Sequence, residues 1–132
     1  MMRYFVYWQD VDKYIEQLSQ KFKFKTYDLT GVYGLPRGGL VLAVMLSHRL
    51  NLPLLQAPFG KCIIIDDVAD SGESLIHYAN NTSNSEDGRQ YYISTMYKKP
   101  KSSVTPDFVY REVSSDTWIE FPWERASKDV LY

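Results

Sequence analysis

The segment from 62 to 74, with the sequence CIIIDDVADSGES, constrains the fold more than any other part of the chain. Its first four residues are apolar and three of them are β-branched, which is typical of a strand buried on both faces of a parallel sheet. Carboxylates, hydroxyls and a glycine follow, and an apolar-periodic helix is predicted to begin at Leu75. The segment therefore predicts a buried strand, an acidic turn, a Ser/Gly loop and a helix N-terminus.

The polar part of this segment suits a phosphorylated sugar. Free backbone N–H groups at the start of a helix favour an anion, and the hydroxyls of Ser71 and Ser74 can add hydrogen bonds. The carboxylates of Asp66, Asp67 and Asp70 suit sugar hydroxyls or a hard cation such as Mg²⁺. The alternative is an ordinary strand–loop–helix whose Asp and Ser residues only form turns and caps.

The rest of the chain alternates predicted helices and strands. The helix over 40–50 is apolar nearly all round, so we expect it to lie between two layers. The polar run 80–89 is expected to be a surface loop. The other expected elements are a strand or extended lead-in over 1–8, a helix from 11 to about 22, strands over 31–35, 53–56, 91–97 and 108–113, and a loop over 114–124.

This alternation predicts an α/β fold with a mainly parallel central sheet, flanked by helices on both faces. With 132 residues, the chain suits one domain over 1–132. Ligands of such sheets bind beyond the carboxyl ends of the strands. Three segments follow predicted strands and are therefore expected at one edge, namely 36–39, 66–74 and 98–101.

The segment Pro36-Arg37-Gly38-Gly39 combines a rigid residue, a permanent cation and two glycines. The glycines allow backbone N–H groups to approach an anion closely, and the guanidinium group matches phosphate oxygens. The segment is a weak signal alone, but it follows a strand and precedes the acidic segment. We therefore interpret Arg37, Gly38 and Gly39 as a second phosphate-binding loop.

Together these segments resemble the type I phosphoribosyltransferases. The 62–74 segment is similar to the family's phosphoribosyl-diphosphate signature, and Arg37-Gly38-Gly39 is similar to its pyrophosphate loop. The run DTWIEFPWE over 116–124 resembles a segment of the bacterial xanthine-guanine branch and its archaeal relatives. The resemblance implies the fold of that family. Relatives often hold a cis peptide bond just before the Arg, which here would be Pro36–Arg37, with Leu35–Pro36 as the energetically cheaper alternative.

The resemblance also implies a base-binding site. Trp118 would cover the purine ring, and the main chain at Trp118 and Ile119 would read the 2-substituent. Lys99, which precedes Pro100 after a predicted strand, would donate to the 6-oxygen of the base, with Lys98 as the alternative. A stacked Trp offers a flat apolar face, although core packing would also account for Trp118.

The implied reaction joins a 6-oxopurine to 5-phosphoribosyl 1-diphosphate with release of diphosphate and with Mg²⁺ as cofactor. Asp66 and Asp67 would hold the ribose hydroxyls and the metal, and Asp70 would be the general base at purine N7. Asp70, Ser71, Gly72, Glu73 and Ser74 would cradle the 5-phosphate, and Arg37 to Gly39 the diphosphate.

One part of the family pattern is missing. Relatives usually carry a long mobile hood loop before the acidic strand, whereas residues 56–61 leave almost nothing here. We therefore expect a shortened hood, and a non-catalytic nucleotide or phosphoribosyl-diphosphate sensor stays an alternative. A phosphoacceptor receiver domain also uses an acidic pair, but it places that pair on the first strand rather than in the middle of the chain.

Composition limits the partners. The net charge of −1 gives no reason to expect nucleic-acid binding. The longest apolar run, 40–46, is far too short to span a membrane, and the N-terminus shows no signal-peptide pattern. The single cysteine excludes an intrachain disulfide. We therefore expect a cytoplasmic protein, and the family resemblance implies small-molecule substrates and a homo-oligomer.

Overall fold

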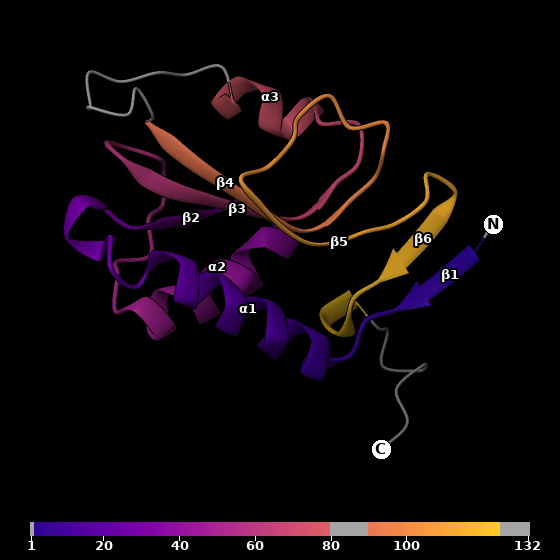
Figure 1. Ribbon diagram of the computed structural model, residues 1–132, viewed down its shortest axis with the longest axis horizontal. Coiled ribbons are helices and arrows are strands. Elements are labelled where there is room, and N and C mark those ends of the chain that lie inside the picture. Colours follow the sequence, from indigo (N-terminus) through magenta and orange to yellow (C-terminus); the bar gives the residue numbers. More distant parts are fainter. Residues whose placement is uncertain (1, 80–89, 125–132) are drawn as a thin grey trace.

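The computed structural model describes residues 2–79 and 90–124. The predicted surface loop over 80–89 and the tail over 125–132 lie outside the described residues. Figure 1 shows a central sheet with helices on both sides and a smaller sheet at one end. Within the described residues, no helix is long and apolar enough to cross a membrane.

The central sheet has four strands, and each neighbouring pair is parallel. Their order in space, β2-β3-β4-β5, is also their order along the chain, so each strand pairs with the next. The mainly parallel sheet predicted from the sequence is therefore confirmed. The strands are β2 (Val32–Gly34), β3 (Cys62–Ala69), β4 (Tyr91–Lys98) and β5 (Phe108–Glu112).

The apolar start of β3 holds the layers together. Its first four side chains are fully buried and alternate between the two faces of the sheet. Ile63 and Ile65 belong to the core shared with helices α1 (Trp8–Phe22) and α2 (Gly38–Leu50). Cys62 and Ile64 belong instead to a second core, which they share with helix α3 (Glu73–Ala79). Both faces of the sheet are thus covered, as expected.

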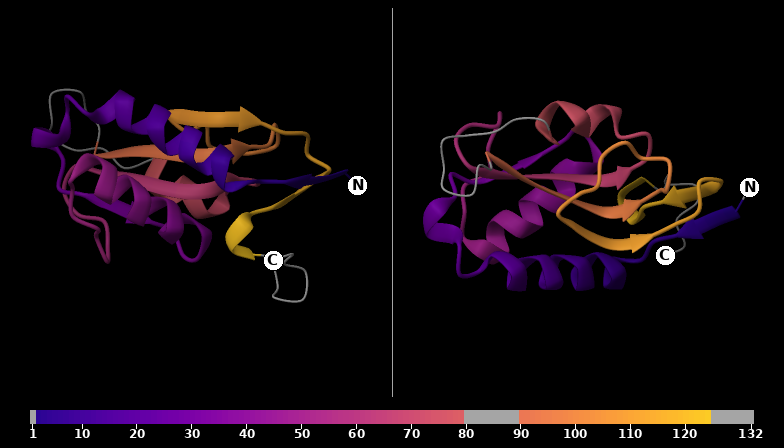
Figure 2. Two further views of the ribbon diagram at one scale, coloured as in Figure 1. Left: turned by 90° about the horizontal axis from the view of Figure 1, so that it is seen from below. Right: turned by 45° about the horizontal axis from the view of Figure 1, so that its top comes forward.

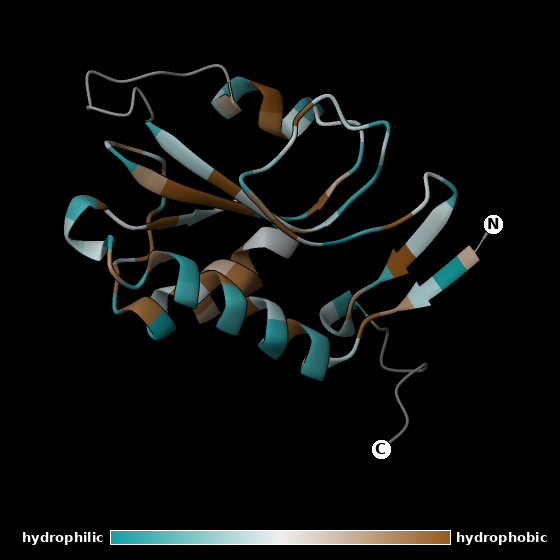
Figure 3. Ribbon diagram, viewed as in Figure 1, coloured by the Kyte–Doolittle hydropathy of each residue, from teal (hydrophilic) through white to brown (hydrophobic). Residues whose placement is uncertain are grey.

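The figures show the same layering. Figure 1 places α1 and α2 below the sheet and α3 above it, and the right-hand view of Figure 2 keeps α3 on the side away from α1. In Figure 3, β3 is largely brown where it crosses the centre, whereas much of α1 is teal. α1 is therefore an amphipathic helix whose polar face is turned to solvent.

A second sheet joins the two ends of the described chain. β1 (Met2–Phe5) and β6 (Thr117–Glu120) pair in parallel, with Arg3 opposite Trp118. The prediction of a loop over 114–124 is therefore wrong at its centre, where residues 117–120 form a strand. The four residues of β6 favour a strand locally, but their partner lies over a hundred residues away in the sequence. Figure 1 shows this small sheet beyond the carboxyl ends of the central strands.

Two further local predictions are wrong. The expected strand over 53–56 is reduced to one bridge between Leu54 and Val32, because the chain turns away after a single pairing. α2 is not enclosed between two layers: Leu40 and Val44 are 38% and 40% exposed. The apolar composition of α2 therefore did not imply burial all round.

Candidate active site

The acidic pair lies within β3 rather than after it, because the strand continues to Ala69. The backbone N–H of Asp67 donates to Asp66 Oδ1 at 2.8 Å, and that of Val68 donates to Asp67 Oδ1 at 2.8 Å. Burial, and then the negative charge of Asp67, raise the pKa of Asp66 to about 8. A cation beside this pair would favour its ionised form.

The 36–39 loop contacts the acidic pair directly. Leu35, the residue before it, donates its N–H to the carbonyl oxygen of Ile65 at 3.0 Å. A Cβ atom on Gly38 would lie only 2.0 Å from Asp67 Oδ2, so the carboxylate occupies the space that the glycine leaves. The Pro36–Arg37 peptide bond is cis, which confirms that prediction. The proposed diphosphate loop and the proposed ribose site are therefore adjacent.

The Ser/Gly loop forms a small pocket after β3. Gly72 has a φ of +91°, a conformation that residues with a side chain rarely adopt. The backbone N–H of Glu73 donates to Ser71 Oγ at 3.3 Å, and α3 begins there. The loop lines a half-open pocket of about 60 Å³. The lining residues are Asp66, Val68, Ala69, Asp70, Ser71, Gly72, Glu73, Ser74 and Leu75.

The loop after β4 packs on the Ser/Gly loop. The backbone N–H of Lys99 donates to the carbonyl oxygen of Ala69 at 2.9 Å, and that of Ser103 donates to the carbonyl oxygen of Ser71 at 2.8 Å. A Cβ atom on Gly72 would lie 2.6 Å from Ser103 Oγ. The carboxyl ends of β3 and β4 are thus joined into one surface, as the parallel sheet predicts.

Asp70 lies between two lysines of that loop. Lys99 Nζ is 3.5 Å from Asp70 Oδ2, and Lys101 Nζ is 3.1 Å from Asp70 Oδ1. Burial raises the pKa of Asp70, but the two ammonium groups together outweigh it and hold that pKa below its ordinary value. Lys98 instead pairs with Glu112 on β5 at 3.5 Å. Of Lys98 and Lys99, Lys99 is therefore the one whose ammonium group pairs with the Ser/Gly loop, at Asp70.

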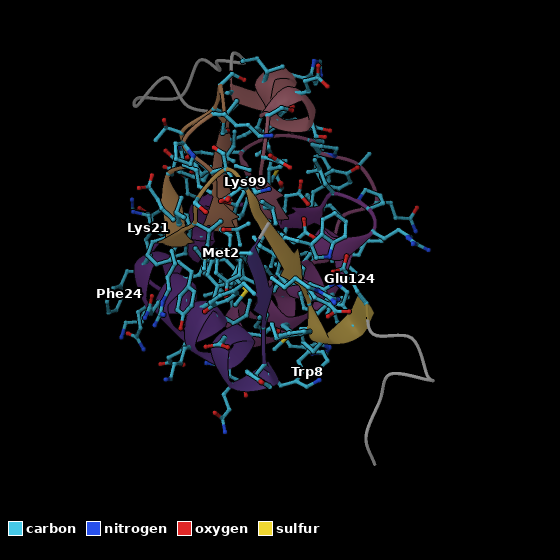
Figure 4. All side chains as sticks on the ribbon, turned by 90° about the vertical axis from the view of Figure 1, so that its right-hand side faces the viewer. Met2, Trp8, Lys21, Phe24, Lys99 and Glu124 are labelled. Carbon is cyan, nitrogen blue, oxygen red and sulfur yellow. The ribbon has the colours of Figure 1, made fainter. Side chains whose placement is uncertain are left out.

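Figure 4 looks onto this edge of the molecule and shows Lys99 near the middle of the view, above Met2. The side chain of Lys99 is only 11% exposed, whereas that of Asp70 is 52% exposed. The side chain of Lys99 is therefore largely shielded from solvent, while the carboxylate of Asp70 stays accessible to a ligand.

Trp118 and Ile119 lie on β6, in the small sheet at the same end of the molecule. Trp118 is 57% exposed, whereas Ile119 packs against the main core. In the preceding turn, the hydrogen bond from Ser114 lowers the pKa of Asp116, and the positive charge of Lys99 adds to this effect. Trp118 is therefore exposed at the end of the molecule where the central strands end.

The short connection before β3 lies at the opposite edge of the sheet. Thr30 Oγ1 donates to the carbonyl oxygen of Phe59 at 2.7 Å, and Thr30 N–H donates to that of Lys61 at 2.9 Å. These contacts hold the connection beside Cys62, at the amino end of β3. It cannot reach the acidic pair, so the shortened hood predicted from the sequence does not cover the site.

Comparisons with known proteins decide the family. No protein-family model matches the chain. A xanthine-guanine phosphoribosyltransferase of Cereibacter sphaeroides is 30% identical, in an alignment that covers 75% of this chain and 71% of that relative. The chain belongs to the type I phosphoribosyltransferase family. A xanthine-guanine phosphoribosyltransferase of Desulfotalea psychrophila is 24% identical and covers 95% of the chain.

A solved structure agrees with this assignment. The purine phosphoribosyltransferase of Pyrococcus horikoshii matches with a TM-score of 0.76 and 26% identity, over 100% of this chain and 99% of that one. The fold predicted from the sequence is that of a phosphoribosyltransferase, and the expected enzyme class, a glycosyltransferase, is confirmed.

Two residues of this phosphoribosyltransferase were not singled out as site residues from the sequence. Lys101 was expected only to lie at the ligand edge, because it follows a predicted strand, and its pairing with Asp70 was not anticipated. Ser103 gave no local signal, since its role depends on the loop after β4 folding back onto Ser71.

Proposed function

We propose that this phosphoribosyltransferase joins a 6-oxopurine (guanine, xanthine or hypoxanthine) to 5-phosphoribosyl 1-diphosphate and releases diphosphate. The observation that carries the proposal is the pairing of Lys99 Nζ with Asp70 Oδ2 at 3.5 Å. It provides a largely buried ammonium donor next to an accessible carboxylate, and an ammonium group prefers a carbonyl oxygen to an exocyclic amine. The names of the relatives support a purine as the acceptor.

The sugar donor would lie across the carboxyl edge of the sheet. The cavity of the Ser/Gly loop, residues 70–74, would take the 5-phosphate through backbone N–H groups and the hydroxyls of Ser71 and Ser74. Arg37, Gly38 and Gly39 would take the diphosphate. The contact between Gly38 and Asp67 supports this arrangement, because it puts the diphosphate loop next to the proposed ribose site.

Asp66 and Asp67 fit Mg²⁺ as a metal shared with the substrate. Within the described residues, no group of three or more His, Cys, Asp or Glu could hold a metal ion by itself. Mg²⁺ commonly uses one or two carboxylates together with substrate phosphates, and the mutual repulsion within this pair is what a cation would relieve. When bound there, Mg²⁺ would neutralise charge on the departing diphosphate.

The transfer step uses residues on both sides of the sugar. The N9 lone pair of the purine forms the bond to C1 of the ribose while the bond from C1 to the diphosphate oxygen breaks, and diphosphate leaves with that electron pair. The proton on N7 passes to the carboxylate of Asp70. Asp66 and Asp67 favour the positive charge that develops on the sugar. Trp118 would stack on the purine, and the main chain of Ile119 would face its 2-substituent.

The uncovered site leaves a second candidate function. Because the 56–61 connection is held at the far edge by Thr30, it cannot keep water from C1. This favours a non-catalytic sensor of nucleotides or phosphoribosyl diphosphate. Against it, 99% of the Pyrococcus horikoshii phosphoribosyltransferase aligns with this chain, which leaves little room for a long extra loop in that protein. We propose a cytoplasmic homo-oligomer in which a second subunit or the bound purine covers the site.

The test is a product analysis with four bases. The protein is incubated with 5-phosphoribosyl 1-diphosphate, Mg²⁺ and guanine, xanthine, hypoxanthine or adenine, and the nucleotides are separated by chromatography. Nucleotide is expected from at least one 6-oxopurine and not from adenine. Binding of the sugar diphosphate without any nucleotide product would favour the sensor, and adenine as the preferred base would contradict the assignment of Lys99.

A further inference from the structure

The two lysines around Asp70 occupy both oxygens of its carboxylate. Lys99 takes Oδ2 and Lys101 takes Oδ1, so neither oxygen is left without a cation. The lysines differ in their setting: the side chain of Lys99 is 11% exposed at the end of β4, whereas that of Lys101 is 53% exposed on the following loop. In this arrangement the carboxylate is ionised and oriented but held from two sides.

The proposed reaction presents one and the same base to both members of the Lys99–Asp70 pair. Asp70 must accept the N7 proton at one oxygen, and Lys99 must donate to the 6-oxygen of the same base. N7 and the 6-substituent lie on one edge of a purine, within reach of a single lysine. A base presented to both residues therefore enters between Lys99 Nζ and Asp70 Oδ2, the longer of the two ion pairs.

We propose that Lys99 exchanges partners, leaving Asp70 for the 6-oxygen of the incoming purine, while Lys101 stays as a positioning residue on the other carboxylate oxygen. This inference rests on the proposed function, and it adds a coupling between recognition of the base and activation of the general base. Oδ2, freed by the exchange, is the oxygen that receives the N7 proton.

The exchange makes Asp70 a better base at the moment when it is needed. Of the described residues, Lys99 and Lys101 are the charged groups that lower the pKa of Asp70. When Lys99 moves away, one of these two cations is lost and the pKa of Asp70 rises. A purine with a 6-amino group cannot cause this change, because an amine and an ammonium group are both donors. The protein would therefore discriminate between 6-oxopurines and 6-aminopurines in the catalytic step as well as in binding.

A matched pair of nucleotides tests the exchange without turnover. Inosine 5′-monophosphate and adenosine 5′-monophosphate share the sugar and phosphate and differ at the 6-position. The pKa of Asp70 is followed by NMR of protein labelled with ¹³C at the aspartate carboxyl carbons, with the signal assigned from the Asp70→Asn variant. We expect a higher pKa of Asp70 with inosine monophosphate than with adenosine monophosphate. Equal values, with both nucleotides bound, would refute the exchange and leave the proposed function intact.

Three variants separate the two lysines. Lys99→Met should abolish the difference between the nucleotides. Lys101→Met should raise the pKa of Asp70 in the free protein and keep the difference, and Lys101→Arg should restore the wild-type value. Lys98→Met is the control, since its ammonium group pairs with Glu112 and donates to the carbonyl oxygen of Lys99 rather than contacting Asp70, and it should change neither value.

The remaining outcomes are also decisive. If Lys99→Met does not fold, the comparison of the two nucleotides on the wild-type protein alone decides the question. A difference that survives in folded Lys99→Met would assign the effect to another group and refute the exchange. If neither nucleotide perturbs the amide signals of residues 71–74, the proposed function fails, and the exchange fails with it.

Discussion

Substitution by alanine should impair activity at Gly38 and stability at the adjacent Gly39. In Gly38→Ala, the new Cβ would lie 2.0 Å from Asp67 Oδ2, about 1 Å closer than Cβ contacts are found. A carboxylate is the end of a flexible side chain, so it can turn away while α2 stays in place. We expect the free energy of unfolding to change by less than about 1 kcal/mol. Transfer should fall by about 10²-fold, the scale of a 1 Å displacement in an active site.

Gly39→Ala should instead destabilise the fold. Its Cβ would lie 2.5 Å from the carbonyl oxygen of Ile65 and 3.1 Å from Asp66 Cα, both in the backbone of the central strand β3. That backbone cannot turn away, so we expect a loss of about 1–3 kcal/mol, the usual cost of overpacking. Urea unfolding and single-turnover transfer are measured on both variants. A wild-type transfer rate in Gly38→Ala, or an equal loss of stability in both, would refute the contact between Gly38 and Asp67.

Three other substitutions test separate parts of the site. Asp70→Asn should lower transfer by about 10²–10⁴-fold and keep the affinity for the sugar diphosphate, and a wild-type rate across pH would exclude Asp70 as the base. Asp66→Asn should stabilise the metal-free protein by an amount that grows as pH rises from about 4 to about 8 and then levels off. The raised pKa of Asp66 favours its neutral form, and that contribution is lost in the wild type as pH passes about 8; parallel stability curves in chelator would contradict this. Trp118→Ala should raise KM for the purine by about 10-fold, from lost stacking, without weakening the sugar diphosphate; equal losses for both would return Trp118 to a structural role.

The central sheet could be predicted because its signals are local. The unbroken apolar run that opens β3 indicated a strand buried on both faces, and the structure buries it between α1 and α2 on one side and α3 on the other. The ligand edge followed from the same reasoning, since carboxyl ends of parallel strands meet at one edge. The cis bond before Arg37 came from the family resemblance rather than from the residues themselves.

The features that were missed depend on contacts between distant segments. β6 forms because Thr117–Glu120 finds β1 at the other end of the chain, a pairing that no local pattern encodes. The two lysines on Asp70 depend on how the loop after β4 folds back onto the Ser/Gly loop. The apolar residues of α2 predicted full burial, but composition does not say whether a second layer is present to cover Leu40 and Val44.

The most direct test of the account is a single-turnover experiment that follows nucleotide and ribose 5-phosphate together. The protein is mixed with 5-phosphoribosyl 1-diphosphate and Mg²⁺, with and without hypoxanthine, at several protein concentrations. We predict slow formation of the nucleotide with hypoxanthine, and detectable ribose 5-phosphate without it, because the 56–61 connection leaves C1 open to water. Fast transfer that is independent of protein concentration, with no hydrolysis, would contradict the uncovered site. Formation of neither product, although the sugar diphosphate binds, would contradict the assignment as a transferase.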